Sequence, residues 1–343
     1  MSKFLKFIKN NITLFGLSLI IVILLIQFMF FNVKINKMYH NINKSSSTNG
    51  ETSGCSVNCN FEFIDFIKVN PNYDPTKEWY EYSQDTHVEV YNSTKLDENG
   101  IAIADDKYNA VTISQYGLNA YGRYITENND EFLEVAIKQA DFLLEMQDKE
   151  TGNYYYDYDY AVYGSDEVLK APWNSAMAVG NTLSLLTRIY YVTQDEKYLD
   201  AAINSLKPLT LDVEEGGLVS YLFGHKYYEK YPTKKGNFAL NGFMFTLIGL
   251  YDFYTVTGNQ LAGRLYNEGI ETLCFALPFY DSVGISLYHL SHLFYDNQPI
   301  HYSDKYHMIH IGQLELLYQL EKEEIFKYYI NRWTSYVSIR EEQ

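Results

Sequence analysis

The feature that most constrains the fold is a repeated set of apolar stripes with the period of an α-helix. From Leu133 to Leu144, apolar residues recur at i, i+4, i+7 and i+11, which marks one buried helix face. Pairs of helices are expected to begin near residues 112, 173, 239 and 307, at spacings of 61, 66 and 68 residues. Further stripes of this kind lie at 175–192, 197–206, 240–256, 261–275, 310–320 and 325–337.

A nearly regular spacing of helix pairs predicts stacked α-hairpins that bury their apolar faces against one another. We therefore expect a mainly α fold, in which residues 109–343 form an incomplete (α/α) toroid, or barrel, with a cleft at one end. Residues 61–108 precede it and alternate apolar and polar residues between turn signals. This pattern predicts a short β-rich segment, with antiparallel strands over 61–69 and 86–93.

The N-terminal region is expected to tether this domain to a membrane. Residues 12–33 contain no charged residue, and about twenty helical residues span the ~30 Å hydrocarbon core of a bilayer. Three lysines precede the run, as suits a cytoplasmic tail at residues 1–11, although further lysines follow it. The run ends without the small residues of a cleavage site, which favours an uncleaved anchor over the alternative, a cleaved signal peptide.

This single-pass signal anchor would place the catalytic domain outside the cytoplasm, on a flexible stalk rich in Ser, Asn and Gly at residues 34–60. Cys55 and Cys59 could form a disulfide there, which would leave Cys274 unpaired. No Asp or Glu precedes Glu51, so the rest of the chain holds 43 acidic against 21 basic residues, a net charge of −22. A body of this charge repels nucleic acid, which we exclude as a partner, and disfavours a heavily sulfated polymer.

Residues 277–316 hold five of the chain's eight histidines together with five tyrosines. Groups that carry or move protons are rarely this dense in a structural segment, so this density predicts a site that binds a polar ligand or moves a proton. His289/His292 and His307/His310 are each spaced i, i+3, which would place both rings on one helix face and could suit zinc. Because no Cys or HExxH pattern accompanies them, we expect no metal site.

A second constellation is YYYDYDY at residues 154–160, where Asp157 and Asp159 alternate with tyrosines. This pattern could contact a sugar, or one carboxylate could serve as the acid of a glycoside hydrolase. The plainer interpretation is an acidic hairpin that packs its tyrosines beneath it, where a structural calcium ion is possible.

Four blocks of the chain resemble the D-glucuronyl C5-epimerase family in its C-terminal catalytic region. The resemblance covers residues 73–333 and implies an N-terminal anchor, β-rich segments and an α/α barrel. It also implies inversion of C5 in glucuronate units of a polysaccharide, which gives iduronate units without an organic cofactor. The blocks are NAVTISQYGLNAY at 109–121, APWNSAMAVGNTLSLLTRIYY at 171–191, YPTKKGNFALNGFMFTLIGLY at 231–251 and the segment at 277–316, with its SLYHLSH and KYHMIH motifs.

The resemblance implies that Tyr231, Tyr288 and Tyr306 are the catalytic tyrosines. It also implies that Asn174, Asn241 and His307 line the substrate cleft. Glu229, Lys230 and Lys305 lie beside the tyrosines in the sequence and are expected to contact the substrate.

The chain departs from its relatives at three positions. Lys230 stands where they carry a glutamate before the Tyr-Pro pair, with Glu229 one residue earlier. Ser291 replaces an arginine, and Val179 replaces a glutamine. The first departure puts one half of the expected acid/base pair in doubt, and the second removes an anion contact.

The reaction explains why tyrosines beside cations would be needed. The C5 proton leaves only when the charge that develops on the neighbouring carboxylate is stabilised, a role we assign to Asn241 and His307. One group must then take the proton and another must return one from the opposite face. We expect Tyr306 to pair with Tyr231 or Tyr288, and a nearby cation to lower the tyrosine pKa from ~10. Lys230, Lys305 and His307 are the candidate cations.

The sequence thus predicts a membrane-anchored uronyl C5-epimerase whose partner is a glucuronate-containing polysaccharide. Two alternatives stay open, a polysaccharide lyase that begins with the same proton abstraction and a non-catalytic glycan-binding protein. A homodimer is also possible.

Overall fold

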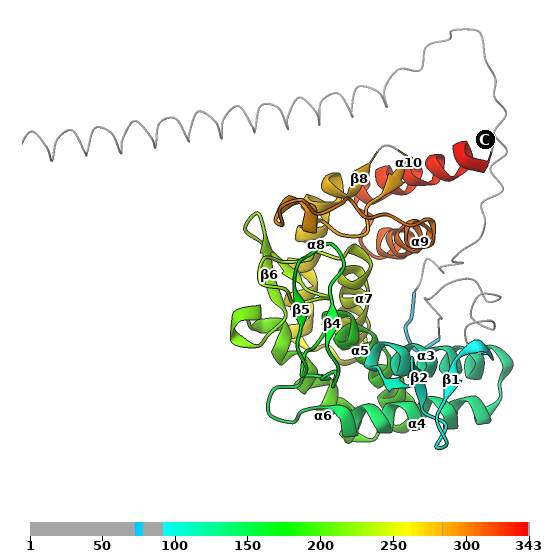
Figure 1. Cartoon of the computed structure of the whole chain (residues 1–343). Coiled ribbons are helices and arrows are strands. Elements are labelled where there is room, and N and C mark those ends of the chain that lie inside the picture. Colours follow the sequence, from blue (N-terminus) through cyan, green and yellow to red (C-terminus); the bar gives the residue numbers. More distant parts are fainter. Residues whose placement is uncertain (1–72, 78–91, 283, 342–343) are drawn as a thin grey trace, which may run out of the picture. The chain divides into compact units, whose positions relative to one another are not determined.

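The computed structural model describes residues 73–77, 92–282 and 284–341 (Figure 1). The expected anchor and stalk, the strand expected at 61–69 and the Cys55–Cys59 pair lie outside these residues. None of the helices in the described part combines the length and apolar character that a bilayer crossing requires. Cys274 is free and half-buried.

Helices in hairpin pairs make up most of the described residues, which confirms the mainly helical fold. The first helix of each pair packs against the first helix of the next, in the order α3, α5, α7 and α9 (Figure 1). The pairs are α3 (Ala110–Glu127) with α4 (Asp130–Met146), α5 (Ala176–Thr193) with α6 (Glu196–Ser205), α7 (Leu240–Thr257) with α8 (Gln260–Tyr280), and α9 (Asp304–Glu321) with α10 (Glu324–Glu341).

The same short turn joins the two helices of each pair. The first helix ends on a residue in the left-handed conformation, which is Asn128, Gln194, Gly258 or Lys322. In the first three pairs an Asn or Asp follows, and its side chain accepts a hydrogen bond from a first-turn N–H of the second helix. These local signals set the hairpin spacing that the apolar stripes predict.

Short antiparallel strands precede the first helix of every pair. A three-stranded sheet before α3 consists of β1 (Lys95–Leu96), β2 (Ala102–Ala104) and β3 (Lys107–Tyr108). These strands fall inside the segment 61–108 but not at the predicted strand 86–93, of which residues 86–91 lie outside the described residues and Asn92 and Ser93 are helical. The hairpins before α5, α7 and α9 were not predicted; they are β4 (Tyr160–Ala161) with β5 (Val168–Leu169), β6 (Val219–Leu222) with β7 (His225–Tyr228), and β8 (Asp281–Ser282) with β9 (Ile285–Ser286).

Helices α5 and α7 form the centre of the core and touch backbone to backbone. A methyl group on Gly249 would lie 2.0 Å from the carbonyl oxygen of Gly180, and one on Gly180 would lie 2.5 Å from that of Phe245. Only glycine permits this approach. Both helices are buried over most of their length, so neither exposes a polar face to solvent.

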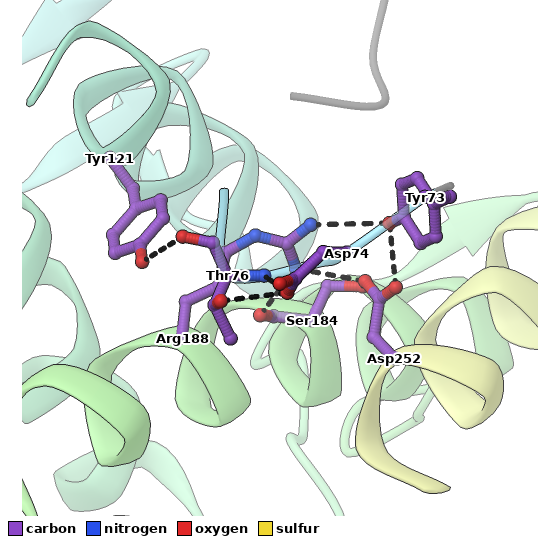
Figure 2. A network of polar contacts seen from close by, with 7 residues as sticks. All are labelled: Tyr73, Asp74, Thr76, Tyr121, Ser184, Arg188 and Asp252. Carbon is purple, nitrogen blue, oxygen red and sulfur yellow. Dashed lines mark hydrogen bonds and ion pairs between the residues drawn. The ribbon is translucent and has the colours of Figure 1, made fainter. Parts of the chain in front are cut away.

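A buried ion pair joins α5 to α7 at the end remote from their first residues (Figure 2). Arg188 Nη1 donates to Asp252 Oδ2 at 2.8 Å, and the two side chains are 2% and 0% exposed. The hydroxyl of Ser184 donates to the same carboxylate at 2.8 Å, and that of Tyr73 donates at 2.7 Å. The network therefore also holds the segment 73–77 against the helices.

Replacing Asp252 by Asn should lower the free energy of unfolding by about 3–5 kcal/mol, because it leaves the buried Arg188 charge without its partner. Denaturant unfolding measures the change. The matched control is Asp159→Asn, which removes the exposed ion pair with Lys170 and should cost under about 1 kcal/mol. Equal losses in the two variants would contradict the account.

Candidate active site

A cavity of about 290 Å³ lies where the first turns of four helices meet. Thr112 of α3, Met177 of α5, Asn241 of α7 and Tyr306 of α9 all line it. Because helix N-termini carry partial positive charge, their convergence favours an anion. The complete lining is Asn109, Val111, Thr112, Gln115, Tyr156, Tyr158, Tyr160, Trp173, Ser175, Met177, Lys230, Tyr231, Asn241, Phe245, Lys305, Tyr306 and Ile309.

The charge of the cavity is opposite to that of the chain. Lys230 and Lys305 line it, and no Asp or Glu stands among its described lining residues, although the whole chain has a net charge of −16. Asn241 contributes an amide whose buried oxygen has no hydrogen-bond partner within the described part of the chain. The cavity thus offers cations and an amide to a ligand that is both anionic and hydroxylated.

One wall of the cavity is aromatic and comes from the YYYDYDY segment. Its alternation turns Tyr156, Tyr158 and Tyr160 to the cavity, while Asp157 and Asp159 are exposed and do not line it. The hydrolase interpretation of these carboxylates therefore has no support in the geometry. Tyr160 stacks on Tyr231, with ring centres 5.2 Å apart and planes 12° from parallel. Aromatic side chains grouped in this way can contact the apolar face of a sugar ring.

The three tyrosines expected to be catalytic surround the amine of Lys230. Its Nζ donates to the hydroxyl of Tyr288 at 2.9 Å. It lies 5.2, 5.4 and 5.8 Å from the ring centres of Tyr231, Tyr288 and Tyr306 respectively. Tyr288 sits behind the lining, its hydroxyl 3.4 Å from that of Tyr231 and its ring centre 4.3 Å from that of Tyr306. The structure thus brings together residues 57 and 75 positions apart in the sequence.

Backbone contacts hold this cluster in place. The carbonyl of Tyr288 accepts from the N–H of Leu240 at 3.0 Å, and its own N–H donates to the carbonyl of His301 at 2.8 Å. Lys230 and Tyr231 lie between β7 and α7, and Tyr306 lies in the first turn of α9. The cluster is therefore built from the entries to two neighbouring helices.

Burial shifts the pKa values of Lys230, Tyr231 and Tyr288 toward their uncharged forms, whereas we expected a charged lysine beside a tyrosine of lowered pKa. It lowers the pKa of Lys230 to about 7 and raises the pKa of Tyr231 and Tyr288 well above 10. We expected a cation to lower a tyrosine pKa. That expectation does not hold for these two tyrosines, because their own burial disfavours the charged phenolate and the neighbouring tyrosines add to the rise in pKa.

Glu229 points away from the cavity, as the residue before Lys230 in an extended segment would. Its carboxylate is fully buried and accepts from the hydroxyl of Ser220 at 2.6 Å and from the N–H of Phe238 at 3.0 Å. Burial raises the pKa of Glu229 to about 7. It is not among the residues lining the cavity, so it does not occupy the place of the glutamate found in relatives.

Two residues expected to line the cleft lie elsewhere. Asn174 donates to the side-chain oxygen of Asn153. His307 accepts from the N–H of Ser286 at Nδ1, at 3.0 Å, and its Nε2 lies 3.1 Å from the carbonyl oxygen of Trp333. Neither residue is part of the cavity lining, which leaves Asn241 and Lys305 as the expected substrate contacts that face it alongside Lys230.

Of the two expected helical histidine pairs, the structure places one on a single helix. His307 and His310 share α9, but His289 precedes the 3₁₀-helix Ser291–Leu293 in which His292 lies. No group of three or more His, Cys, Asp or Glu in the described residues is arranged to hold a metal ion. Ser291, at the place of the relatives' arginine, is buried against Asn237.

Sequence reasoning pointed to the YYYDYDY segment as a possible sugar contact through its aspartates, but it did not name Tyr156, Tyr158 or Trp173 as residues of the cavity. Their common signal is position, because all three lie in the segment that leads from α4 into α5, as Lys230 and Tyr231 lie in the segment that leads from β7 into α7. An aromatic segment before each helix pair is therefore the pattern that could have located them.

A profile of the family described as the D-glucuronyl C5-epimerase C-terminus matches residues 147–335. The chain belongs to this family. It is 31% identical over 280 residues to a D-glucuronyl C5-epimerase of Caenorhabditis elegans, covering 76% of this chain and 45% of the relative. The chain thus spans less than half the length of that protein.

The chain is also similar to two further proteins. An uncharacterized protein of Methanocaldococcus jannaschii is 27% identical over 218 residues, which cover 60% of this chain and 67% of the relative. The solved structure of cellobiose 2-epimerase from Bacillus thermoamylovorans superposes with a TM-score of 0.52 at 13% identity, over 74% of this chain and 68% of that one. The second likeness concerns the fold alone.

Glu229→Gln should change the pH dependence of stability. Between about pH 4.5 and about pH 7 the folded chain holds a proton on Glu229 that the unfolded chain has lost, so this residue makes the free energy of unfolding fall as pH rises. Glutamine removes that dependence. Urea unfolding at about pH 5 and about pH 8 should show the variant gaining stability relative to the unaltered chain at the higher pH. A difference independent of pH would contradict the buried carboxyl.

Proposed function

We propose that this chain is a carbohydrate epimerase that inverts C5 of D-glucuronate units within a polysaccharide to give L-iduronate units, with no organic cofactor. The observation that carries the proposal is a cavity with no Asp or Glu among its described lining residues, formed at four helix N-termini and lined by Lys230, Tyr231 and Tyr306, with Tyr288 behind them. Membership of the family and the 31% identity to a D-glucuronyl C5-epimerase support the same reaction.

The cavity can stabilise the charge that proton removal creates. When the C5 proton leaves, negative charge spreads onto the adjoining carboxylate, and fixed cations and dipoles lower the energy of that state. Lys305, the amide of Asn241 and the helix N-termini provide them from the cavity wall. The Asn241 amide can donate to a carboxylate through its nitrogen.

Inversion also needs proton carriers on both faces of the sugar ring, a form of general acid–base catalysis. Tyr306 and Tyr231 both line the cavity, from α9 and from the entry to α7, and Lys230 lies between their rings. A uronate held between these groups would meet an acid or a base on either face. Tyr306 is the tyrosine we assign to one face.

The aromatic wall supports a polymer as substrate. The ring centre of Trp173 lies 5.6 Å from that of Tyr160, which in turn stacks on Tyr231, so a cluster of aromatic side chains is available to sugar units next to the reacting one. The acidic body favours an unsulfated chain over a heavily sulfated one. We further propose that residues 12–33 anchor the enzyme in a membrane with this domain outside the cytoplasm.

The direct test is ¹H NMR of glucuronate polymers incubated with the protein in deuterated water. Loss of the C5 proton signal and growth of iduronate signals, with the chains intact, are expected. Chain cleavage with new ultraviolet absorbance from an unsaturated sugar would instead establish a lyase. Polymer binding with no exchange would establish a glycan-binding protein and contradict the proposal.

Tyr306→Phe should reduce deuterium incorporation at C5 by about 10²–10⁴-fold, because it deletes one proton carrier and leaves the ring in place. The matched control is Tyr302→Phe, four residues earlier and 58% exposed, which should keep full activity. Undiminished exchange in Tyr306→Phe would remove Tyr306 from the reaction.

A further inference from the structure

Lys230 is partly buried and, unlike the buried Arg188, has no carboxylate beside it among the described residues. Arg188 is held by Asp252, whereas no ion pair in the described residues includes Lys230. The hydrogen-bond partner of its amine is a tyrosine hydroxyl. A lysine without a counter-charge, surrounded by aromatic rings, is costly to keep protonated, and a structural role does not explain it.

The path of the Lys230 side chain is also specific. Its aliphatic stem crosses the first turn of α7 at Gly242, where an added methyl group would lie 2.6 Å from Lys230 Cβ and 2.8 Å from Cδ. These are atoms near the start and middle of the side chain, so the chain cannot swing aside while its amine stays in place. Gly242 is therefore a positioning residue that lets the amine reach the cavity.

We propose that the amine of Lys230, in place of a carboxylate, is the proton carrier on one face of C5, and that Tyr288 links it to Tyr306 on the other face. This inference rests on the proposed epimerase function. It assigns the second proton carrier, the half of the pair that the sequence left in doubt.

The steps balance without a cofactor. The neutral amine takes the C5 proton: the C–H bond breaks, an N–H bond forms, and the electron pair moves toward the carboxylate. Tyr306 then gives its hydroxyl proton to the opposite face of C5, leaving a phenolate and an ammonium. The ammonium of Lys230 returns a proton through the hydroxyl of Tyr288 to Tyr306, which restores all three groups.

The protonation of the cluster agrees with these roles. Burial lowers the pKa of Lys230 to about 7, so the neutral and charged forms coexist near neutral pH, where a general base is most effective. Burial raises the pKa of Tyr288, which keeps it a protonated relay. From α9, Tyr306 and His310 face the amine, and burial lowers the pKa of His310, with the Lys230 charge adding to this shift.

Among the described residues of the elements that face the Lys230 amine, no carboxylate lies beside it to hold it in its charged form. Tyr231 adjoins it, and the neighbouring Glu229 carboxylate is turned toward Ser220 and Phe238. Lys305 shares the cavity and is a like charge. A bound uronate is then the anion that enters this site.

Lys230→Arg separates proton transfer from charge, because a guanidinium stays protonated at every accessible pH. We expect Lys230→Arg and Lys230→Met each to lose about 100-fold or more in the kcat of C5 exchange, since a positioned acid or base contributes about 10²–10⁴-fold. The KM for polymer should change much less. The unaltered chain should lose activity below about pH 7, where Lys230 becomes protonated, and the residual activity of the two variants should not show this loss. Lys234→Met, an exposed lysine four residues on, should behave as the unaltered chain.

Gly242→Ala should reproduce the loss in kcat while the chain stays folded. Full activity in Lys230→Arg would overturn the inference and leave the epimerase proposal standing, with Lys230 as an anion contact. No exchange by the unaltered chain on any polymer would overturn both.

A stability measurement tests the amine apart from activity. Between about pH 7 and about pH 10.5 the unfolded chain binds a proton that folded Lys230 has lost, so the unaltered chain gains stability with rising pH. Lys230→Met lacks this gain, so its Tm should exceed that of the unaltered chain most below about pH 7 and least near pH 10. A Tm difference independent of pH would overturn the inference.

Discussion

The close approach of α5 and α7 is the contact on which the rest of the molecule depends. Gly180 and Gly249 let the two backbones touch, and the Arg188–Asp252 pair fixes the far ends of the same helices. Two helices held this tightly must begin side by side. The segments that lead into them, which carry Trp173 and the Lys230–Tyr231 pair, therefore meet at one place.

The chemistry of the cavity follows from that geometry. Helices entering side by side bring several positive N-terminal ends to one cavity, and the short strands before them leave room for aromatic side chains rather than for solvated loops. An amine placed among these rings loses its water and with it much of its charge. The desolvation that makes Lys230 costly to the fold is thus what would make it useful as a base near neutral pH.

Part of this structure could be read from the sequence because it depends on local signals. Apolar stripes located the helix pairs to within a few residues, since each helix buries one face against the next. The motifs around Tyr231, Tyr288 and Tyr306 pointed to residues that do come together. The strands before α5, α7 and α9 were not predicted, because an alternation of apolar and polar residues cannot be recognised over two to four residues. The surroundings of His307 were not predicted either, because Ser286 and Trp333 are distant from it in the sequence.

The protonation states of Lys230 and the tyrosines around it could not be predicted from the sequence. A neighbouring cation lowers the pKa of a tyrosine only if the cation keeps its charge, and that depends on burial, which is a property of the fold. In a solvated loop the same lysine would keep its charge and would act to lower the pKa of a tyrosine beside it, as we expected.

The most direct test of the account is therefore an NMR titration of the full chain labelled with ¹³C in its lysine side chains, with Lys230→Met to assign the signal. We predict that the ¹³Cε resonance of Lys230 titrates near pH 7. A midpoint near 10.4, the usual value for an exposed lysine, would contradict the account.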